Sequence, residues 1–482
     1  MGSIERVFGR FRGKSVSTNR KILAASAIIA VIGFGVKLVS LANASFIAKF
    51  FGTTYRNDCY LEAFLIPMTL GAVLSGSLNQ VLIPTYIEVR DTEGQEAGHR
   101  LFTSMLMWNT VALLGLSGIL LATTGLWLPL MASKFNPHEL QLTTSLLQCL
   151  IPIVLIGGFT SMWGAVLNSK ERFGVVAIGP IMQPTMAIVF MFAFQKQWGI
   201  FALAYGTVFG SLLEAILVGY TVHRTGHPLF PRWFGMTDAV RRVRAQYFAC
   251  IAGAIVLNGT SLVDMGFAGS LGQGSVATLN YGIRVPGVFI ALMLTAVGTA
   301  VLPMYSQLVA KRDWAKLRHT IRTCVIYLLI GSVIVTLILI ACSPLIIRIL
   351  FEHGKFTSKD TEIVSHVQRL SLLGAPVAIM LVPVTRTFTA LRANNIMSMV
   401  SVGSLILNAV ADYVLMKRFG LPGIALATSV WMSLVGVTLF SILYFYLLPK
   451  AERTSPPYVE AVMEGPPSPS ETAMLDPYET VE

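Results

Sequence analysis

Long apolar runs set the strongest constraint on how this chain folds. Each run is long enough to cross a bilayer, which takes about 20 residues of helix. Lipid offers no hydrogen-bond partner to the backbone, so segments of this length span it as helices. The twelve runs cover residues 22–48, 59–84, 101–131, 140–168, 174–194, 200–222, 246–268, 280–306, 320–347, 364–391, 396–416 and 423–448. The sequence therefore predicts an all-α polytopic membrane protein with about 12 transmembrane helices.

A repeated proline pattern divides the runs into two alike halves. Pro67, sixteen residues, Pro84, one residue and Tyr86 return as Pro286, sixteen residues, Pro303, one residue and Tyr305. Proline interrupts the backbone hydrogen bonds of a helix, and broken spans at equivalent places in two halves are typical of transporters built from repeats. Six spans per half give both halves the same orientation, so we expect a parallel internal repeat.

The repeat and the composition of the ends predict the domain organisation. We expect an N-lobe at 22–222, a cytoplasmic linker at 223–245 and a C-lobe at 246–448. Residues 1–21 place apolar side chains at helical spacing among arginines, which suits a basic amphipathic helix on the inner leaflet. Residues 449–482 become rich in proline, serine and glutamate, which predicts a disordered cytoplasmic tail.

The distribution of charge predicts the topology and excludes several classes of protein. Basic residues gather in alternate loops, so both termini are expected in the cytoplasm. The net charge of +12 follows from this topology and does not indicate nucleic-acid binding. Gly13-Lys14-Ser15 resembles the end of a phosphate-binding loop, but Phe8 stands where that loop needs glycine. We therefore expect neither an enzyme nor an ATPase, and transport driven by an ion gradient, the membrane potential or the substrate's own gradient.

Cations within the spans are candidates for binding an anion. Ionisable residues are costly in lipid and default to functional hypotheses. Lys37 and Arg284 are the stronger candidates, because Arg369 and Arg386 lie near the ends of their span. Arginine matches two phosphate oxygens at once. The alternative is that these side chains reach to the interface or pair with Glu62 or a backbone carbonyl.

Oxygen-bearing side chains in the second half form a candidate cation site. Asn408 and Asp412 lie four residues apart and share one helix face. Asp264 lies in an earlier span, and Thr428 follows Ile424 by one helical turn. Carboxylate, amide, hydroxyl and carbonyl oxygens suit a hard cation. The alternatives are a protonated carboxyl group that hydrogen-bonds to a neighbouring helix, or a position of Asp412 at an outer helix end.

Several motifs resemble one family of transporters. They are Phe51-Gly52, Asp58, Pro67, Gln80 and Pro84 in the first half, and in the second half 264–271, Leu279-Asn280-Tyr281 with Arg284, Leu302-Pro303, 350–357 with Asp360, and 423–428. In order and spacing they resemble the MurJ/MviN lipid-linked glycan flippases of the multidrug/oligosaccharidyl-lipid/polysaccharide exporter superfamily. The resemblance covers roughly residues 22–448.

The resemblance implies a fold, a cargo and a set of site residues. It implies a MATE-like fold of two six-helix lobes in the bacterial inner membrane, which alternately opens inward and outward. The implied cargo is a polyprenyl-diphosphate-linked sugar, with lipid II typical of the family. Some members bind sodium with an acid, an Asn-x3-Asp pair and a threonine, and Asp264, Asn408, Asp412 and Thr428 match that pattern.

Departures from the family bear on the cargo. Lys37 replaces an arginine, and Asn43, Gly71 and Ala72 stand where the family has further arginines. Two spans that typical members carry after the twelfth are absent. A different lipid-linked glycan, such as an exopolysaccharide precursor, therefore stays open beside lipid II.

We expect a flippase whose cavity holds the diphosphate at Lys37 and Arg284, with Asp58, Glu62 and Arg386 nearby. One alternative is a cation-coupled exporter of small organic molecules, for which Glu62 and Glu214 are the support. Another is a non-transporting scaffold of a glycan-synthesis complex. The expected partners are the lipid-linked glycan, membrane lipids and glycan-synthesis enzymes that contact the cytoplasmic tail.

Overall fold

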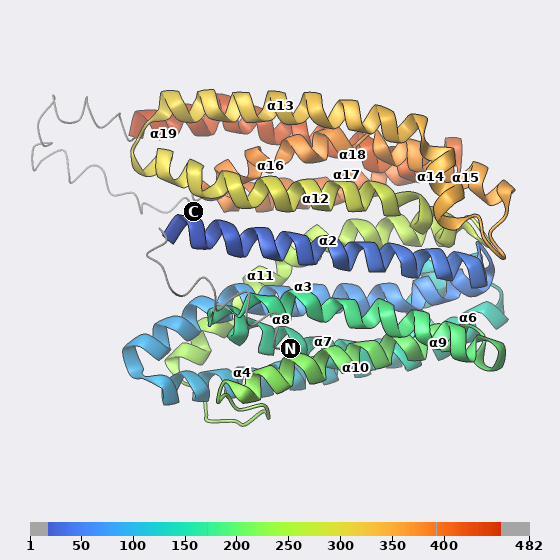
Figure 1. Cartoon of the computed structure of the whole chain (residues 1–482), viewed down its shortest axis with the longest axis horizontal. Coiled ribbons are helices and arrows are strands. Elements are labelled where there is room, and N and C mark those ends of the chain that lie inside the picture. The colour runs from blue at the N-terminus through green and yellow to red at the C-terminus, as the bar shows by residue number, and fades with distance from the viewer. Residues whose placement is uncertain (1–17, 171, 392, 455–482) are drawn as a thin grey trace, which may run out of the picture.

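The computed structural model is almost entirely helical and describes residues 18–170, 172–391 and 393–454 (Figure 1). Side chains are described from residue 31 onward, apart from positions 75, 248, 249, 252, 256, 257, 299 and 300. The predicted amphipathic helix at 1–21 lies outside the described residues except for its end. The same holds for the predicted tail, of which only the part up to Thr454 is described, as helix.

The first half of the chain forms long helices, several of them built from two pieces. They are α2 (Thr18–Phe51), α3 (Tyr55–Glu93), α4 (Gln95–Ala122), α5 (Thr124–Met131), α6 (Pro137–Leu150), α7 (Pro152–Ser169), α8 (Phe173–Ile178), the short 3-10 helix η1 (Gly179–Ile181), α9 (Met182–Trp198) and α10 (Ile200–Arg224).

The second half repeats this order of long and interrupted helices. Its elements are α11 (Asp238–Gly269), α12 (Ser275–Ala310), α13 (Trp314–Ala341), α14 (Ser343–Phe351), α15 (Ser358–Leu372), α16 (Ala375–Ala390), α17 (Asn394–Phe419), α18 (Leu421–Ser441), the π-helical turn η2 (Ile442–Leu447) and α19 (Leu448–Thr454).

Within the described part of the chain, 11 helices or helix pairs are long and apolar enough to cross a membrane. The 32-residue α11 is a further long helix, at the place of the predicted seventh span. These elements confirm the predicted fold class of about twelve membrane helices. Helix α11 begins at Asp238, inside the predicted 223–245 linker, because Thr237 caps it by accepting a hydrogen bond from the Val240 N–H at 3.3 Å.

The repeated prolines lie inside helices that continue through them. Helix α3 contains Pro67 and Pro84, and α12 contains Pro286 and Pro303. The expectation of broken spans at these prolines is therefore wrong, since a proline removes one donor but a long helix packed on its neighbours tolerates that loss. The helix breaks lie elsewhere, between α6 and α7 and between α15 and α16, where prolines stand in the first turn of the following helix.

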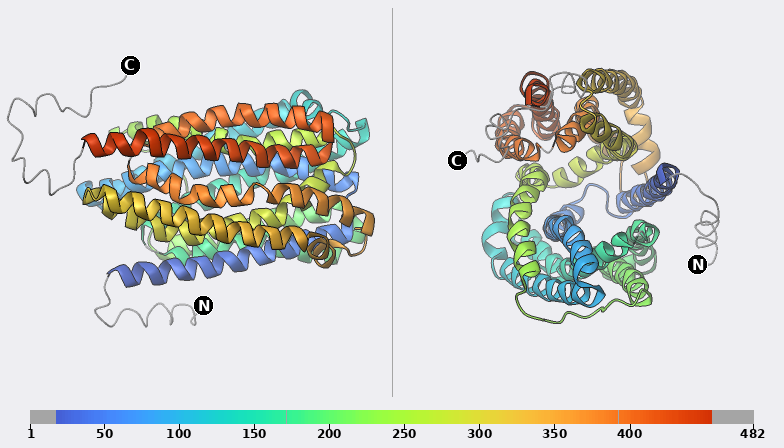
Figure 2. Two further views of the ribbon diagram at one scale, coloured as in Figure 1. Left: turned by 90° about the horizontal axis from the view of Figure 1, so that it is seen from above. Right: turned by 90° about the vertical axis from the view of Figure 1, so that its left-hand side faces the viewer.

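Seen end-on, the helices gather in two groups with α2 and α11 between them (Figure 2). Helix α11 belongs to both groups. Near its start, Val243 and Tyr247 pack in an apolar cluster with α3, α4 and α7, whereas Met265 and Ala268 near its end pack with α12, α15 and α18. The last turns of α2 likewise pack against α12, α14 and α15 through Ala44 and Ala48.

Small residues allow α9 and α10 to approach each other closely. A Cβ atom on Gly206 would lie 2.8 Å from the Cα of Ala187, and one on Gly210 would lie 2.5 Å from the Cα of Gln183. Small residues at helix contacts are typical of membrane proteins, because close backbone approach maximises van der Waals contact where no hydrophobic effect acts.

Replacing Gly210 by alanine should therefore destabilise the protein, since the added methyl group meets backbone that cannot move aside easily. We expect a cost of about 1–3 kcal/mol, as for overpacked cores, measured as a lower thermal unfolding midpoint in detergent. The control is Gly115→Ala in α4, where a Cβ atom meets nothing within 4 Å. Equal midpoints for the two variants would contradict the close packing of α9 on α10.

Candidate functional site

The first half of the chain caps the first turn of α12. The Asp58 carboxylate, on α3, accepts hydrogen bonds from the backbone N–H of Ala277 at 2.7 Å and from the backbone N–H of Gly274. Asp58 is 0% exposed. A carboxylate at a helix N-terminus satisfies free N–H groups and complements the helix dipole. The structure thus places Asp58 in a contact between the halves, with both carboxylate oxygens occupied.

Asn57 adds a second polar contact at the same place. Its side-chain amide donates to the Gly52 carbonyl and to the Tyr281 hydroxyl, both at 2.9 Å, and all three residues are buried. We call this set, Gly52, Asn57, Asp58, Gly274, Ala277 and Tyr281, the α3–α12 junction.

The stretch that most resembled the transporter family lies beside this junction, between α14 and α15. The backbone N–H of Lys355 donates to the Lys49 carbonyl at 3.0 Å, and Thr53 donates to Asp360 at 2.6 Å. Gly354 has a φ of 64°, which side-chain-bearing residues rarely adopt, and its Cα faces Lys49 too closely for a Cβ atom. The two halves are therefore joined at this end by backbone as well as side-chain hydrogen bonds.

Arg284 is a cation without a carboxylate partner among the described residues. It lies half-buried on α12, one turn past the junction residue Tyr281, and its Nε donates to the Asn280 side chain at 3.1 Å. None of the ion pairs among the described residues involves it. Lys37 is exposed on α2, a helix that packs against α12. An arginine with free N–H donors and no counter-ion can bind an anion without breaking an existing pair.

Glu62 and Arg386 contact other helices without forming ion pairs. Glu62 is 1% exposed, and neither of its carboxylate oxygens has a hydrogen-bond partner among the described residues. It lies against Gly269 at the end of α11, where a Cβ atom would be 3.1 Å from its Oε1. Arg386 lies against Gly298 of α12, and its Nε is buried without a partner in the described chain. Both side chains thus retain unused hydrogen-bonding capacity.

The predicted cation-binding residues come together from three helices. Asn408 of α17 donates to Asp264 of α11 at 3.2 Å, and Thr428 of α18 donates to Asp264 at 3.3 Å. The Thr428 hydroxyl also lies 3.2 Å from the Ile424 carbonyl. Asp412 is buried one turn after Asn408. We call these five residues, Asp264, Asn408, Asp412, Ile424 and Thr428, the oxygen cage.

The chemistry of the cage fits a hard monovalent cation. Both oxygens of Asp412 and the Oδ1 of Asn408 are buried without a hydrogen-bond partner within the described residues. Buried oxygens of this kind are costly unless a proton or cation satisfies them. No group of three or more His, Cys, Asp or Glu side chains that could hold a metal ion occurs in the described chain. The cage instead mixes two carboxylates with amide, hydroxyl and carbonyl oxygens.

Comparison with known proteins places the chain in a family. The family model of the lipid II flippase MurJ matches residues 47–464. The chain belongs to this family, within the MOP superfamily. It is therefore a multi-pass inner-membrane transporter of the flippase class and not an enzyme.

Curated relatives and solved structures agree with this assignment. The chain is 25% identical to the probable lipid II flippase MurJ of Synechocystis sp., over 89% of this chain and 82% of that protein. It is 24% identical to the lipid II flippase MurJ of Burkholderia cenocepacia, over 86% of this chain and 82% of that protein. A lipid II flippase MurJ in an inward closed conformation superposes with a TM-score of 0.76 at 22% identity, over 92% of this chain and 94% of that one. An inward-facing MATE family multidrug transporter gives a TM-score of 0.71 at 11% identity, over 88% of this chain and 99% of that one. This similarity confirms the MATE-like fold.

Sequence reasoning missed most of the α3–α12 junction. It selected Asp58 as a substrate ligand, but it did not select Asn57 or Gly274, whose partners lie more than 200 residues away. One signal was present in the sequence. Gly272-Gln273-Gly274-Ser275 precedes a span, and a helix start of that kind, with no acid in its first turn, needs acceptors from elsewhere.

Asp58→Asn should weaken the junction. An asparagine presents one acceptor and one donor, so one of the two buried N–H groups of α12 would face a donor. An unsatisfied buried N–H costs about 1–3 kcal/mol, and we expect the thermal midpoint to fall accordingly. Asp238→Asn, at an exposed position in the first turn of α11, is the control. If both variants unfold at the wild-type temperature, the cap contributes nothing to stability.

Proposed function

We propose that the protein moves a polyprenyl-diphosphate-linked oligosaccharide across the inner membrane by alternating access. The observation that carries the proposal is Arg284, which is half-buried on a membrane helix of this family and has no counter-ion within the described residues. Diphosphate is the part of such a substrate that an unpaired guanidinium binds, because its oxygens accept two N–H donors at once. Lys37, on the neighbouring α2, would supply a second cation.

Lipid II is the cargo that the names of the curated relatives support. Related isoprenoid-linked glycans share the diphosphate and the tail, and they differ in the sugars. The loss of arginines at Asn43, Gly71 and Ala72 removes charge from the region that would face the cargo, so an exopolysaccharide precursor stays the alternative within the same class.

Orientation gives the junction its place in the transport cycle. With both termini in the cytoplasm, as the positive-inside pattern favours, the α3–α12 junction lies at the outer side of the membrane. Hydrogen bonds between the halves then close the outer side, and the lobes must break them to release cargo there. A substrate or ion shifts this equilibrium only through different affinities for the two states.

Sodium at the oxygen cage would bias the conformational equilibrium. The cage joins α11, α17 and α18, so an ion bound by Asp264 and Asp412 would hold these helices together. Helix α11 packs on the first half near its start and on the second half near its end, so a change in its position would alter its contacts with both halves.

Glu62 offers support for the competing function, a cation-coupled exporter, since its carboxylate, unpaired within the described residues, could bind an organic cation.

Flipping by the reconstituted protein tests the cationic site. We expect Lys37→Ala and Arg284→Ala to slow flipping of a polyprenyl-diphosphate-linked glycan in liposomes by roughly 10- to 100-fold, the loss expected for one charge-assisted hydrogen bond. Arg241→Ala, at an exposed position on α11, removes the same charge elsewhere and serves as the control. Wild-type rates in both test variants would refute the diphosphate site. A wild-type protein that flips nothing would favour a scaffold.

Sodium binding can be tested without transport. We expect Na⁺ to raise the thermal midpoint of the wild type above its value in K⁺, because a ligand that binds only the folded state stabilises it. Asp412→Asn and Thr428→Val should each remove most of this increase, whereas Ser404→Ala, one turn before Asn408 on α17, should retain it. An increase of equal size in all four proteins would show that the oxygen cage does not bind the ion.

A further inference from the structure

A cavity of about 680 Å³ lies at the end of the N-terminal half opposite the α3–α12 junction. It is formed by the first turn of α4, the last turn of α10 and the segment 225–237 that leads to α11. Its lining residues that carry the argument are His99, Arg100, His223, His227, Phe230 and Arg232. We call it the linker pocket. Neither the cationic site nor the oxygen cage includes any of these residues.

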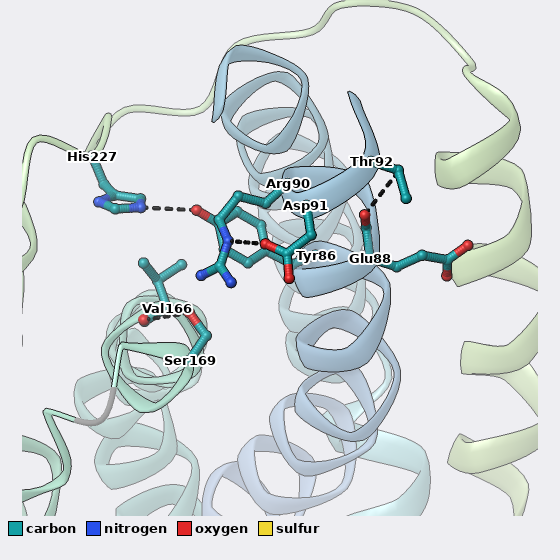
Figure 3. A network of polar contacts seen from close by, with 8 residues as sticks. All are labelled: Tyr86, Glu88, Arg90, Asp91, Thr92, Val166, Ser169 and His227. Carbon is teal, nitrogen blue, oxygen red and sulfur yellow. Dashed lines mark hydrogen bonds and ion pairs between the residues drawn. The ribbon is translucent and has the colours of Figure 1, made fainter. Parts of the chain in front are cut away.

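Hydrogen bonds hold the wall of the linker pocket in place. The Tyr86 hydroxyl of α3 lies 2.9 Å from His227 Nε2, and Figure 3 shows its ring pointing toward that imidazole. Lys170, just past α7, lies 3.5 Å from His227 Nδ1 and donates to the Thr225 carbonyl at 3.4 Å. The Phe234 backbone N–H donates to Ser104 of α4 at 3.2 Å. Hydrogen bonds thus hold the 225–237 segment against α3, α4 and the end of α7.

Permanent cations give the pocket its charge. Burial, with the nearby Lys170 as the next cause, lowers the pKa of His227 to about 4, so this imidazole is neutral at pH 7. Positive charge comes from Arg100 and Arg232 in the lining and from Lys170 behind it. Glu96 is the acid in the lining, and it occupies one Arg100 nitrogen at 2.6 Å. The rest of the Arg100 guanidinium, and all of exposed Arg232, remain available to phosphate oxygens.

One lining residue has an unused polar atom. The Nε2 of His99 is buried and has no hydrogen-bond partner among the described residues, and the His99 ring meets that of His227 edge-on at 4.7 Å between centroids. This nitrogen is closed off from the surface, so it does not reach a ligand in the linker pocket.

Exposed aromatic side chains place the pocket at the lipid surface. Phe230 is 75% exposed, and Trp233, Phe234 and Met236 in the same segment are exposed as well. Large apolar side chains beside arginines, at the end of a bundle of membrane helices, are typical of the interface where headgroups lie. Free phosphate would leave these side chains in water, whereas a phospholipid would cover them with its glycerol and acyl chains.

We propose that the linker pocket binds the phosphate of an anionic phospholipid from the inner leaflet. Arg100 and Arg232 hold the phosphate oxygens, and Phe230 and Phe234 contact the upper acyl chains. This assignment rests on the cytoplasmic orientation proposed above but not on the cargo. A lipid bound here holds the 225–237 segment, which connects α10 to α11, against the N-terminal half.

Direct binding to the intact purified protein tests the proposal. We expect native mass spectrometry in neutral detergent to show retention of phosphatidylglycerol in preference to phosphatidylcholine. In Arg100→Gln/Arg232→Gln the affinity for phosphatidylglycerol should fall by about 30-fold, since each basic residue near an anionic lipid contributes about a factor of five. The matched control, Arg241→Gln/Arg242→Gln, removes two exposed arginines from α11 on the same side of the protein and should bind as the wild type does.

Thermal unfolding supplies a second readout and separates the two sources of phosphate. Phosphatidylglycerol should raise the midpoint of the wild type and of the control but not that of the double variant. Inorganic phosphate at the same concentration should raise none of them. Equal stabilisation by inorganic phosphate would overturn the lipid assignment. Loss of binding in the control as well, or undiminished binding in the double variant, would overturn the pocket.

Discussion

One buried carboxylate reaches from the first half of this protein to the second and caps a helix there. Asp58 of α3 accepts from the N–H groups of Gly274 and Ala277, the first free donors of α12. In water a helix can leave such donors to solvent, but here the helix start is buried between the halves. A partner is therefore required, and this contact adds to the other hydrogen bonds that join the two halves at this end.

The position of this contact follows from the internal repeat. Asp58 and Ala277 differ by 219 positions, which is the offset that relates Pro67 to Pro286 and Pro84 to Pro303. Equivalent residues of a parallel repeat meet only near the axis that relates the halves. An acid at both positions would place two carboxylates together, so the pairing needs unlike residues at equivalent sites. Asp58 opposite Ala277 fulfils this, with a carboxylate on one side and a free backbone donor on the other.

The sequence predicted local features well and contacts between the halves poorly. Span 200–222 became α10 and span 396–416 became α17, each within a few residues, because apolar length and loop polarity are local signals. The oxygen cage could be assembled in advance, since Asn408 and Asp412 share a helix face and the motif resembled a known family. The role of Asp58 as a helix cap could not be inferred, because a carboxylate that caps a distant helix and one that faces a substrate have the same local sequence. The start of α11 was missed for a related reason, since its first turns are polar and pack on α3 through residues far away in the chain.

The same asymmetry between equivalent positions explains where charge is left unpaired. Leu65 in the first half corresponds to Arg284 in the second, more than two turns beyond the starts of α3 and α12. Both oxygens of the Asp58 carboxylate accept backbone hydrogen bonds, and no ion pair within the described residues joins it to Arg284. The first half therefore uses its acid to cap α12, and the second presents an arginine whose donors other than Nε have no partner within the described residues. The α3–α12 junction and the proposed anion site at Arg284 share helix α12, so a diphosphate bound at Arg284 would lie where it can influence the contact that must open to release it.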